Sequence, residues 1–115
     1  MCSREDFKTI LLNNPGFVVV KVGADWCKPC KLLAPILNRL TPTLPSTVAY
    51  MEIDVDTDLG SFLKSKKQIN GIPVLLAYKQ GNFTPYADQS LTGPTEAQVG
   101  AFFGAMRALA PPDKK

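Results

Sequence analysis

The chain has 115 residues, 45% of them hydrophobic, which is enough for one packed domain over residues 1–115 without a metal or a disulfide scaffold. Its net charge of +3 comes with no arginine-rich or long basic run, so we expect no nucleic acid partner. No stretch approaches the roughly 20 apolar residues that span a membrane, so we expect no membrane association. Glu5 and Asp6 stand where a secretory signal needs an apolar segment, which favours a cytoplasmic protein.

Hydrophobic spacing predicts the element order α-β-α-β-α-β-β-α, followed by a frayed tail over 110–115. The first elements are a helix over 4–12, a strand over 17–22 and a helix that begins near Pro29 or Cys30. A strand over 48–55, a helix capped by Asp58 that runs to about 67, and a hairpin with strands over 74–79 and from Asn82 follow. A capping box of Thr95 and Gln98 begins the last helix, about 95–109. A helix joins the first two strands, so we predict an α/β fold, a three-layer α/β/α sandwich around a mixed four-stranded sheet.

Residues 26–30, "WCKPC", hold two cysteines three positions apart at the start of a predicted helix. Free N–H groups and the helix dipole stabilise a thiolate at the first cysteine, and the second lies one turn on. We therefore expect Cys27 to be the exposed, readily ionised nucleophile that attacks a substrate disulfide, and Cys30 to displace the product from the mixed disulfide. Pro29 suits the first turn of a helix, and Lys28 adds positive charge that favours the thiolate.

Two other interpretations of the cysteine pair stay open at this point. A zinc site needs further ligands, but the chain has no histidine and only one other cysteine, Cys2, so we expect no metal. The two thiols could instead be buried structural residues, although a lysine and a proline between them disfavour a dry site. Cys2 is most simply an exposed thiol, with a dimerising or regulatory role as the alternative.

With these residues in place, the sequence resembles the thioredoxin family over nearly its whole length. "WCKPCK" looks like the family's WCGPCK, and four other segments resemble family segments in the same order: "FVVVKVGADWC", "EIDVD", "GIPVLLAYKQG" and "LTGPTEAQV". The resemblance implies a thioredoxin-like fold and a protein disulfide reductase without a prosthetic cofactor. Its substrates would be disulfide-containing proteins, and its electron donor would be an NADPH-dependent, thioredoxin-reductase-like protein. The chain would act as a monomer. The alternative is a binding module, or a partner protein of narrow specificity with a weakly reducing site.

The resemblance also implies roles for residues outside the cysteine pair. Trp26 would flank the nucleophile, and Gly93 would complete a shallow apolar groove with Pro29. Ile72 and Pro73 would be joined by a cis peptide bond that presents the Ile72 backbone to an extended substrate. The alternative for Pro73 is a trans proline that opens a strand.

Three departures from the family pattern stand out. Only Met1 and Cys2 precede the first helix, so we predict that the family's N-terminal strand is missing or vestigial. Lys21 occupies the position where the family keeps a buried aspartate beneath the resolving cysteine, and Glu52 stands where many members have a lysine. Either Lys21 pairs with Glu52 beneath the disulfide, or it reaches solvent from the strand end. A cation there, with Lys28, would stabilise the reduced dithiol, so we expect a less reducing couple than in a typical thioredoxin.

Overall fold

The structure is a computed structural model, and it describes residues 4–110. Its helices are α1 (Arg4–Leu12), α2 (Lys28–Leu40), α3 (Asp58–Ser65) and α4 (Glu96–Leu109), with a short 3₁₀ turn at Thr41–Thr43. Its strands are β1 (Phe17–Gly23), β2 (Val48–Asp54), β3 (Val74–Lys79) and β4 (Gln89–Thr92). The expectations for Met1, Cys2 and the tail beyond residue 110 lie outside the described residues.

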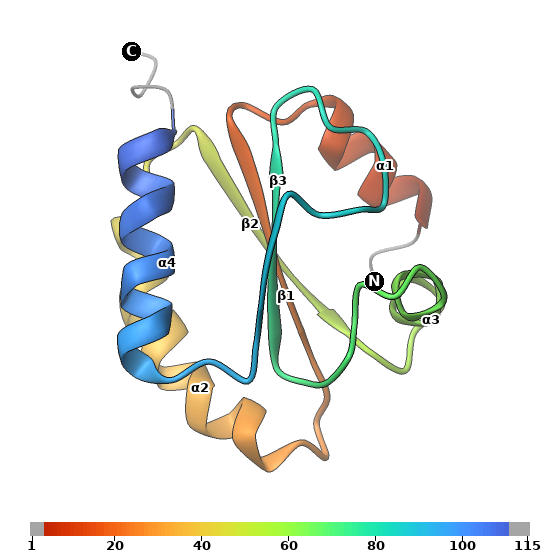
Figure 1. Ribbon diagram of the computed structural model, residues 1–115, viewed down its shortest axis with the longest axis vertical. Helices are drawn as coiled ribbons and strands as arrows, with labels where there is room; N and C mark the ends of the chain where they lie inside the picture. Colours follow the sequence, from red (N-terminus) through yellow and green to blue (C-terminus); the bar gives the residue numbers. More distant parts are fainter. Residues whose placement is uncertain (1–3, 111–115) are drawn as a thin grey trace.

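The strands form one mixed sheet in the order β2-β1-β3-β4 (Figure 1). β1 pairs parallel with β2 and antiparallel with β3, and β3 pairs antiparallel with β4. β1 lies between two neighbours, and six of its seven residues are buried, as the nearly continuous apolar run predicts. The predicted mixed four-stranded sheet is confirmed.

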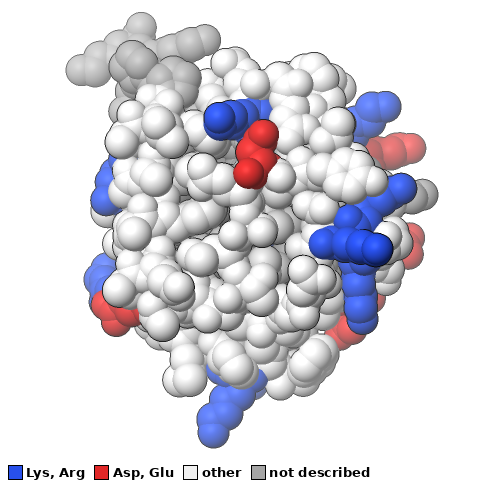
Figure 2. Space-filling view, viewed as in Figure 1, with Lys and Arg blue, Asp and Glu red and all other residues white. Residues whose placement is uncertain are grey.

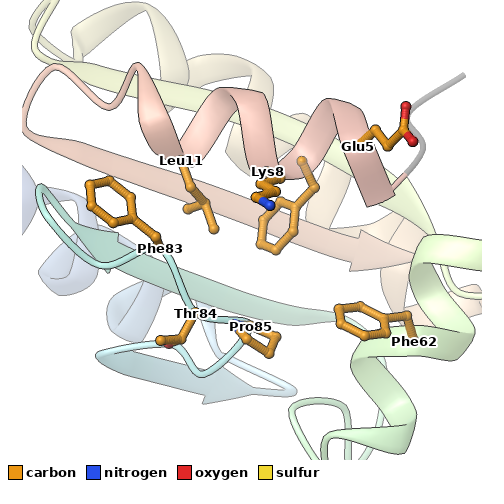
Figure 3. Close-up of a pocket in the computed structure, with 8 residues that line it drawn as sticks. Glu5, Lys8, Leu11, Phe62, Phe83, Thr84 and Pro85 are labelled. Atoms are coloured by element: carbon orange, nitrogen blue, oxygen red, sulfur yellow. The ribbon is translucent and has the colours of Figure 1, made fainter.

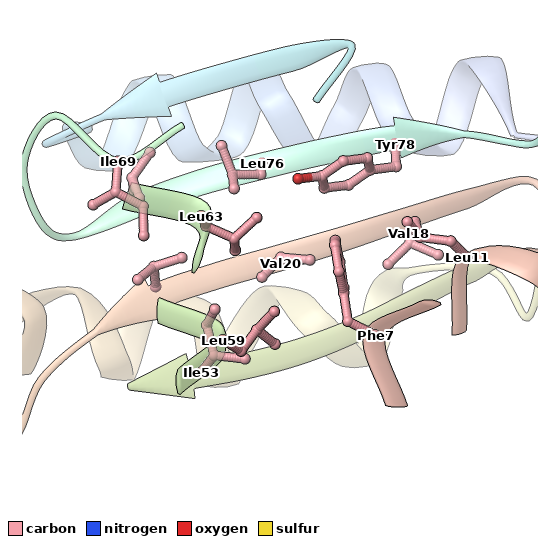
Figure 4. Packing of buried hydrophobic residues seen from close by; sticks show 12 residues of the cluster. Phe7, Leu11, Val18, Val20, Ile53, Leu59, Leu63, Ile69, Leu76 and Tyr78 are labelled. Atoms are coloured by element: carbon pink, nitrogen blue, oxygen red, sulfur yellow. The ribbon is translucent and has the colours of Figure 1, made fainter. Parts of the chain in front are cut away.

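Helices cover both faces of this sheet, with α2 and α4 on one side and α1 and α3 on the other (Figure 1). Because side chains alternate along a strand, Val18 and Val20 pack toward α1 and α3, whereas Val19 packs toward α2 and α4. Figure 4 shows the first of these two cores, where Phe7 of α1 meets Tyr78 of β3. The predicted three-layer α/β/α sandwich is therefore confirmed.

Two local predictions are wrong. The helix over 58–65 is capped by Thr57, whose hydroxyl accepts the Gly60 amide at 3.2 Å, so Asp58 is the first helical residue rather than the cap. The second hairpin strand begins at Gln89, not at Asn82. The intervening residues form a loop because the side chains of Asn82, Thr84 and Asp88 bond to the loop's own groups and take the place of a strand ladder.

Within residues 4–110, no helix combines the length and the apolar character needed to cross a bilayer.

Candidate active site

Cys27 and Cys30 form a disulfide at the amino end of α2, with their Cα atoms 5.3 Å apart. Cys27 is the N-cap of the helix, and its sulfur accepts a hydrogen bond from the Cys30 amide at 3.2 Å. This amide is one of the free N–H groups that every helix start presents. When the disulfide is reduced, the same amide and the helix dipole stabilise a Cys27 thiolate. The geometry is that of a dithiol–disulfide centre.

The predicted exposure of Cys27 is wrong for this oxidised state. Cys27 is 4% exposed, almost as buried as Cys30 at 3%. Its sulfur faces inward because it is bonded to the Cys30 sulfur and to the Cys30 amide. Lys28 and Pro29, which stand between the two cysteines in the first turn of α2, are exposed.

Trp26 is 68% exposed and stands directly before Cys27. Its indole Nε1 donates to the Asp56 carboxylate at 2.8 Å, which fixes the ring against the loop between β2 and α3. Trp26, Asp56 and Ile72 help to line one pocket of about 370 Å³. Asp56 was not among the site residues predicted from the sequence. Its signal is its place just beyond β2, because parallel strands β1 and β2 end at the same side of the sheet.

The Ile72–Pro73 peptide bond is cis, as the resemblance implies, and the trans alternative is wrong. Pro73 is buried directly before β3, and its carbonyl accepts the Gly93 amide at 2.8 Å. Gly93 has a φ of +56°, a left-handed conformation that favours glycine. Val74 pairs with Val22 near the end of β1, so Pro73 lies at the end of the sheet where the cysteine loop begins.

Lys21 and Glu52 are paired in the register of β1 and β2, and both line a pocket of about 340 Å³ that reaches Cys30. The predicted ion pair between them is nevertheless wrong: these two described residues form none. Glu52 is exposed, and its carboxylate instead accepts the Tyr50 hydroxyl at 2.8 Å. Burial first, and then the hydrogen bond and the charge of Glu52, raise the pKa of Tyr50 well above its ordinary value. Lys21 is half-buried and lines this pocket together with Cys30.

The space beside Gly23 shows how far the Lys21 ammonium lies from the Cys30 sulfur. A Cβ atom built on Gly23 would lie 3.0 Å from the Lys21 Nζ and 3.1 Å from the Cys30 Sγ. Because both atoms lie that near to one point, Nζ and Sγ cannot be more than about 6 Å apart. Gly23 was not singled out from the sequence, where only its place at the strand end, two residues after Lys21, hints at this role.

A separate pocket of about 300 Å³ lies between α1, α3 and the loop after β3 (Figure 3). Phe83 and Leu11 face each other across it, and Phe62 closes the side next to α3. It shares no lining residue with the pocket beneath the disulfide. Among residues 4–110, no three acidic, cysteine or histidine side chains gather in a way that would hold a metal ion.

Comparisons with known proteins agree with this geometry. A family model described as Thioredoxin matches residues 1–102. Thioredoxin Y2 of Arabidopsis thaliana, which is named as chloroplastic, is 37% identical over 65% of this chain and 44% of its own length. Thioredoxin of Haemophilus influenzae is 30% identical over 66% of this chain and 69% of its own length.

A solved Plasmodium falciparum thioredoxin matches the fold with a TM-score of 0.76 at 25% identity, covering 91% of this chain and 95% of that one. The chain spans less than half the length of the Arabidopsis relative and about two thirds or more of the other two proteins. Together, the family match over most of the sequence, the matching fold and the disulfide beside Trp26 show that the chain belongs to the thioredoxin family.

Proposed function

We propose that the chain is a thiol–disulfide oxidoreductase that reduces protein disulfides through Cys27 and Cys30. The observation that carries the proposal is the Cys27–Cys30 disulfide at the amino end of α2, in a chain of the thioredoxin family. A sulfur at that position receives a backbone N–H bond and the field of the helix, which is what a thiolate nucleophile needs. The redox-active group is the disulfide itself, and no prosthetic cofactor is required.

The reaction proceeds by two exchanges. The Cys27 thiolate attacks one sulfur of a substrate disulfide, the substrate S–S bond breaks, and the second substrate sulfur leaves as a thiolate that takes a proton from water. The Cys30 thiolate then attacks the Cys27 sulfur, and the first substrate sulfur leaves in the same way. Two electrons pass from the dithiol to the substrate, and the chain ends with the Cys27–Cys30 disulfide.

Substrate binding is assigned to the surface around the disulfide. Trp26 and Gly93 are exposed there, and Ile72 shares a pocket with Trp26. Within the described part of the chain, no backbone hydrogen bond uses the amide or the carbonyl of Ile72. An extended substrate can therefore bond to the Ile72 backbone as an added strand, with buried Pro73 holding this loop in place.

The electron donor in this proposal is an NADPH-dependent, thioredoxin-reductase-like protein, and the substrates are proteins with accessible disulfides. Figure 2 shows few Lys, Arg, Asp and Glu side chains over the middle of the face in view, whereas blue side chains gather at its right edge. The proposal includes no nucleic acid partner, because the sequence has no arginine-rich or long basic run. We also propose one domain, a monomer and a cytoplasmic location. Since one relative is named as chloroplastic, fractionation of the source cells tests that location.

An insulin-reduction assay with dithiothreitol as the electron source tests the function. Wild type is expected to accelerate insulin precipitation, and Cys30→Ser to lose multiple turnover, because its Cys27 mixed disulfide has no internal thiol to resolve it. Activity that survives the loss of Cys30 would contradict the two-cysteine mechanism. A wild type that binds partners but reduces no disulfide would favour a binding module instead.

A further inference from the structure

Lys21 is the one charged side chain in β1, and it is half-buried in a strand whose other six residues are buried. Partial burial of an ammonium group costs solvation free energy unless a group of opposite charge lies close to it. Its register neighbour Glu52 does not pair with it and is bonded to Tyr50. The Cys30 sulfur lies within about 6 Å of the Lys21 Nζ, across the space that Gly23 leaves empty, and lines the same pocket.

The pocket beneath the disulfide holds other charges that must be weighed. Besides Lys21 and Glu52, it is lined by Asp25 from the cysteine loop, Lys31 from α2 and Asp54 from β2. Asp25, Lys31 and Glu52 are exposed, so solvent screens them, and the half-buried Asp54 is engaged by the Asp56 amide at 2.8 Å. Lys21 is half-buried and lies close to the sulfur, so its charge acts most strongly on Cys30.

We infer that Lys21 is the counter-ion of the Cys30 thiolate in the reduced protein, and that Gly23 keeps open the space across which the ammonium acts on the sulfur. Lys21 is thus a positioning residue that works through Cys30. This inference rests on the proposed function, because it concerns how Cys30 resolves the mixed disulfide.

A counter-ion changes how the second exchange begins. A protonated lysine cannot act as the base for the Cys30 thiol, so the Cys30 proton passes to solvent before the exchange, and the Lys21 ammonium stabilises the resulting thiolate. That thiolate attacks the Cys27 sulfur, the bond to the substrate breaks, and the substrate sulfur leaves as a thiolate. At a given pH a larger fraction of Cys30 is therefore the thiolate, without a base that must first collect a proton.

The charge of Lys21 also affects the reduction potential of the Cys27–Cys30 pair. Lys21 stabilises the thiolate of the reduced state, and the oxidised state has no thiolate to stabilise. A cation within about 6 Å lowers the pKa of an acidic group by about 1 to 3 units, and we expect the lower end because Lys21 is half exposed. At a pH above the Cys30 titration midpoint this favours the reduced form about tenfold, which corresponds to about 30 mV for a two-electron couple and makes the chain a weaker reductant; the effect fades as the pH falls below that midpoint.

The first test titrates Cys30 as the only thiol, in a Cys2→Ser, Cys27→Ser background, by its thiolate absorbance. Lys21→Met keeps the length and apolar stem of the side chain without the charge, and we expect its titration midpoint to rise by about one pH unit. Lys21→Arg keeps the charge and is expected to restore the midpoint. Gly23→Ala keeps Lys21 but wedges a methyl group between Nζ and Sγ, so a smaller shift in the same direction is expected.

The second test equilibrates the chain, with all its cysteines, against glutathione redox buffers at a pH above the Cys30 midpoints that the first test gives. Lys21→Met is expected to be about tenfold easier to oxidise than wild type, and Lys21→Arg to match wild type. Lys8→Met is the matched control, because it removes the same charge from an exposed site on α1, across the sheet, and is expected to change nothing. Circular dichroism checks that each variant is folded. If Lys21→Met does not fold, Gly23→Ala is compared with wild type instead.

An unmoved midpoint and an unmoved equilibrium in Lys21→Met and Gly23→Ala would overturn the inference, as would Lys21→Arg behaving like Lys21→Met. These results leave the proposed function standing as long as wild type still reduces insulin. Wild type that fails to reduce insulin, whatever Lys21 does, would instead contradict the proposed function.

Discussion

Asp56 offers a direct prediction about the substrate surface, because its carboxylate holds the indole of Trp26 in place. The bond from Nε1 is 2.8 Å long and ends on a charged oxygen, but both residues are exposed. A charge-assisted bond in such a position contributes about 1 kcal/mol. Asp56→Ala is therefore expected to free the indole and lower kcat/KM for a protein disulfide about fivefold, since about 1.4 kcal/mol corresponds to a factor of ten.

The assay combines insulin-reduction kinetics with the fluorescence anisotropy of Trp26, the single tryptophan of the chain. Asp56→Ala is expected to lower the anisotropy of the indole together with kcat/KM. Asp56→Asn is the matched control, because its amide oxygen still accepts the Nε1 proton, and it is expected to retain most of both values. Wild-type kinetics and anisotropy in Asp56→Ala would refute the assignment, and equal damage in both variants would show that charge, not the hydrogen bond, matters.

Two further predictions concern stability. Gly60→Ala places a methyl group against the backbone of Val55 and is expected to lower the free energy of unfolding by about 1–3 kcal/mol, whereas Gly100→Ala, in open space on α4, is expected to raise it by about 0.5–1 kcal/mol. Urea unfolding measures both, and a loss of stability in Gly100→Ala would refute the distinction. Partial burial acts to raise the pKa of Asp88, but hydrogen bonds, led by that from the Lys79 amide, and the charge of Lys79 outweigh it and lower the pKa. Asp88 thus stabilises the fold above about pH 4, and this contribution is lost as the pH falls through the lowered folded-state pKa. The stability difference between wild type and Asp88→Asn is expected to shrink over that acid range, and a difference that is constant with pH would contradict the assignment.

The sequence was sufficient where the signals are local or repeated along the chain. The β3 strand was predicted with the bounds it has, because an apolar run stands between Pro73 and a turn. The capping box of Thr95 and Gln98 was predicted as well, because both partners lie within one helical turn, and both of its hydrogen bonds are present. The redox-active cysteine pair was predicted likewise, because it is defined locally by residues 26–30 and the start of a helix.

Contacts between distant segments could not be predicted in the same way. The position of Glu52 opposite Lys21 was anticipated, but its choice of Tyr50 as partner depends on side-chain directions that only the folded sheet sets. The start of the second hairpin strand was predicted wrongly for a related reason. The side-chain hydrogen bonds of Asn82 compete with strand pairing, and the sequence has no alternating pattern there that would mark the start of the strand.

The central claim is that Cys27 is the nucleophile and Cys30 the resolving thiol. The most direct measurement incubates Cys30→Ser and Cys27→Ser, each also carrying Cys2→Ser, with a disulfide-containing protein and identifies mixed disulfides by mass spectrometry. We expect a stable adduct on Cys27 in the first variant, because the helix start activates that sulfur, and little adduct in the second, because Cys30 lies inside α2 and not at its N-cap. An adduct that accumulates on Cys30 while Cys27 stays free would contradict the account.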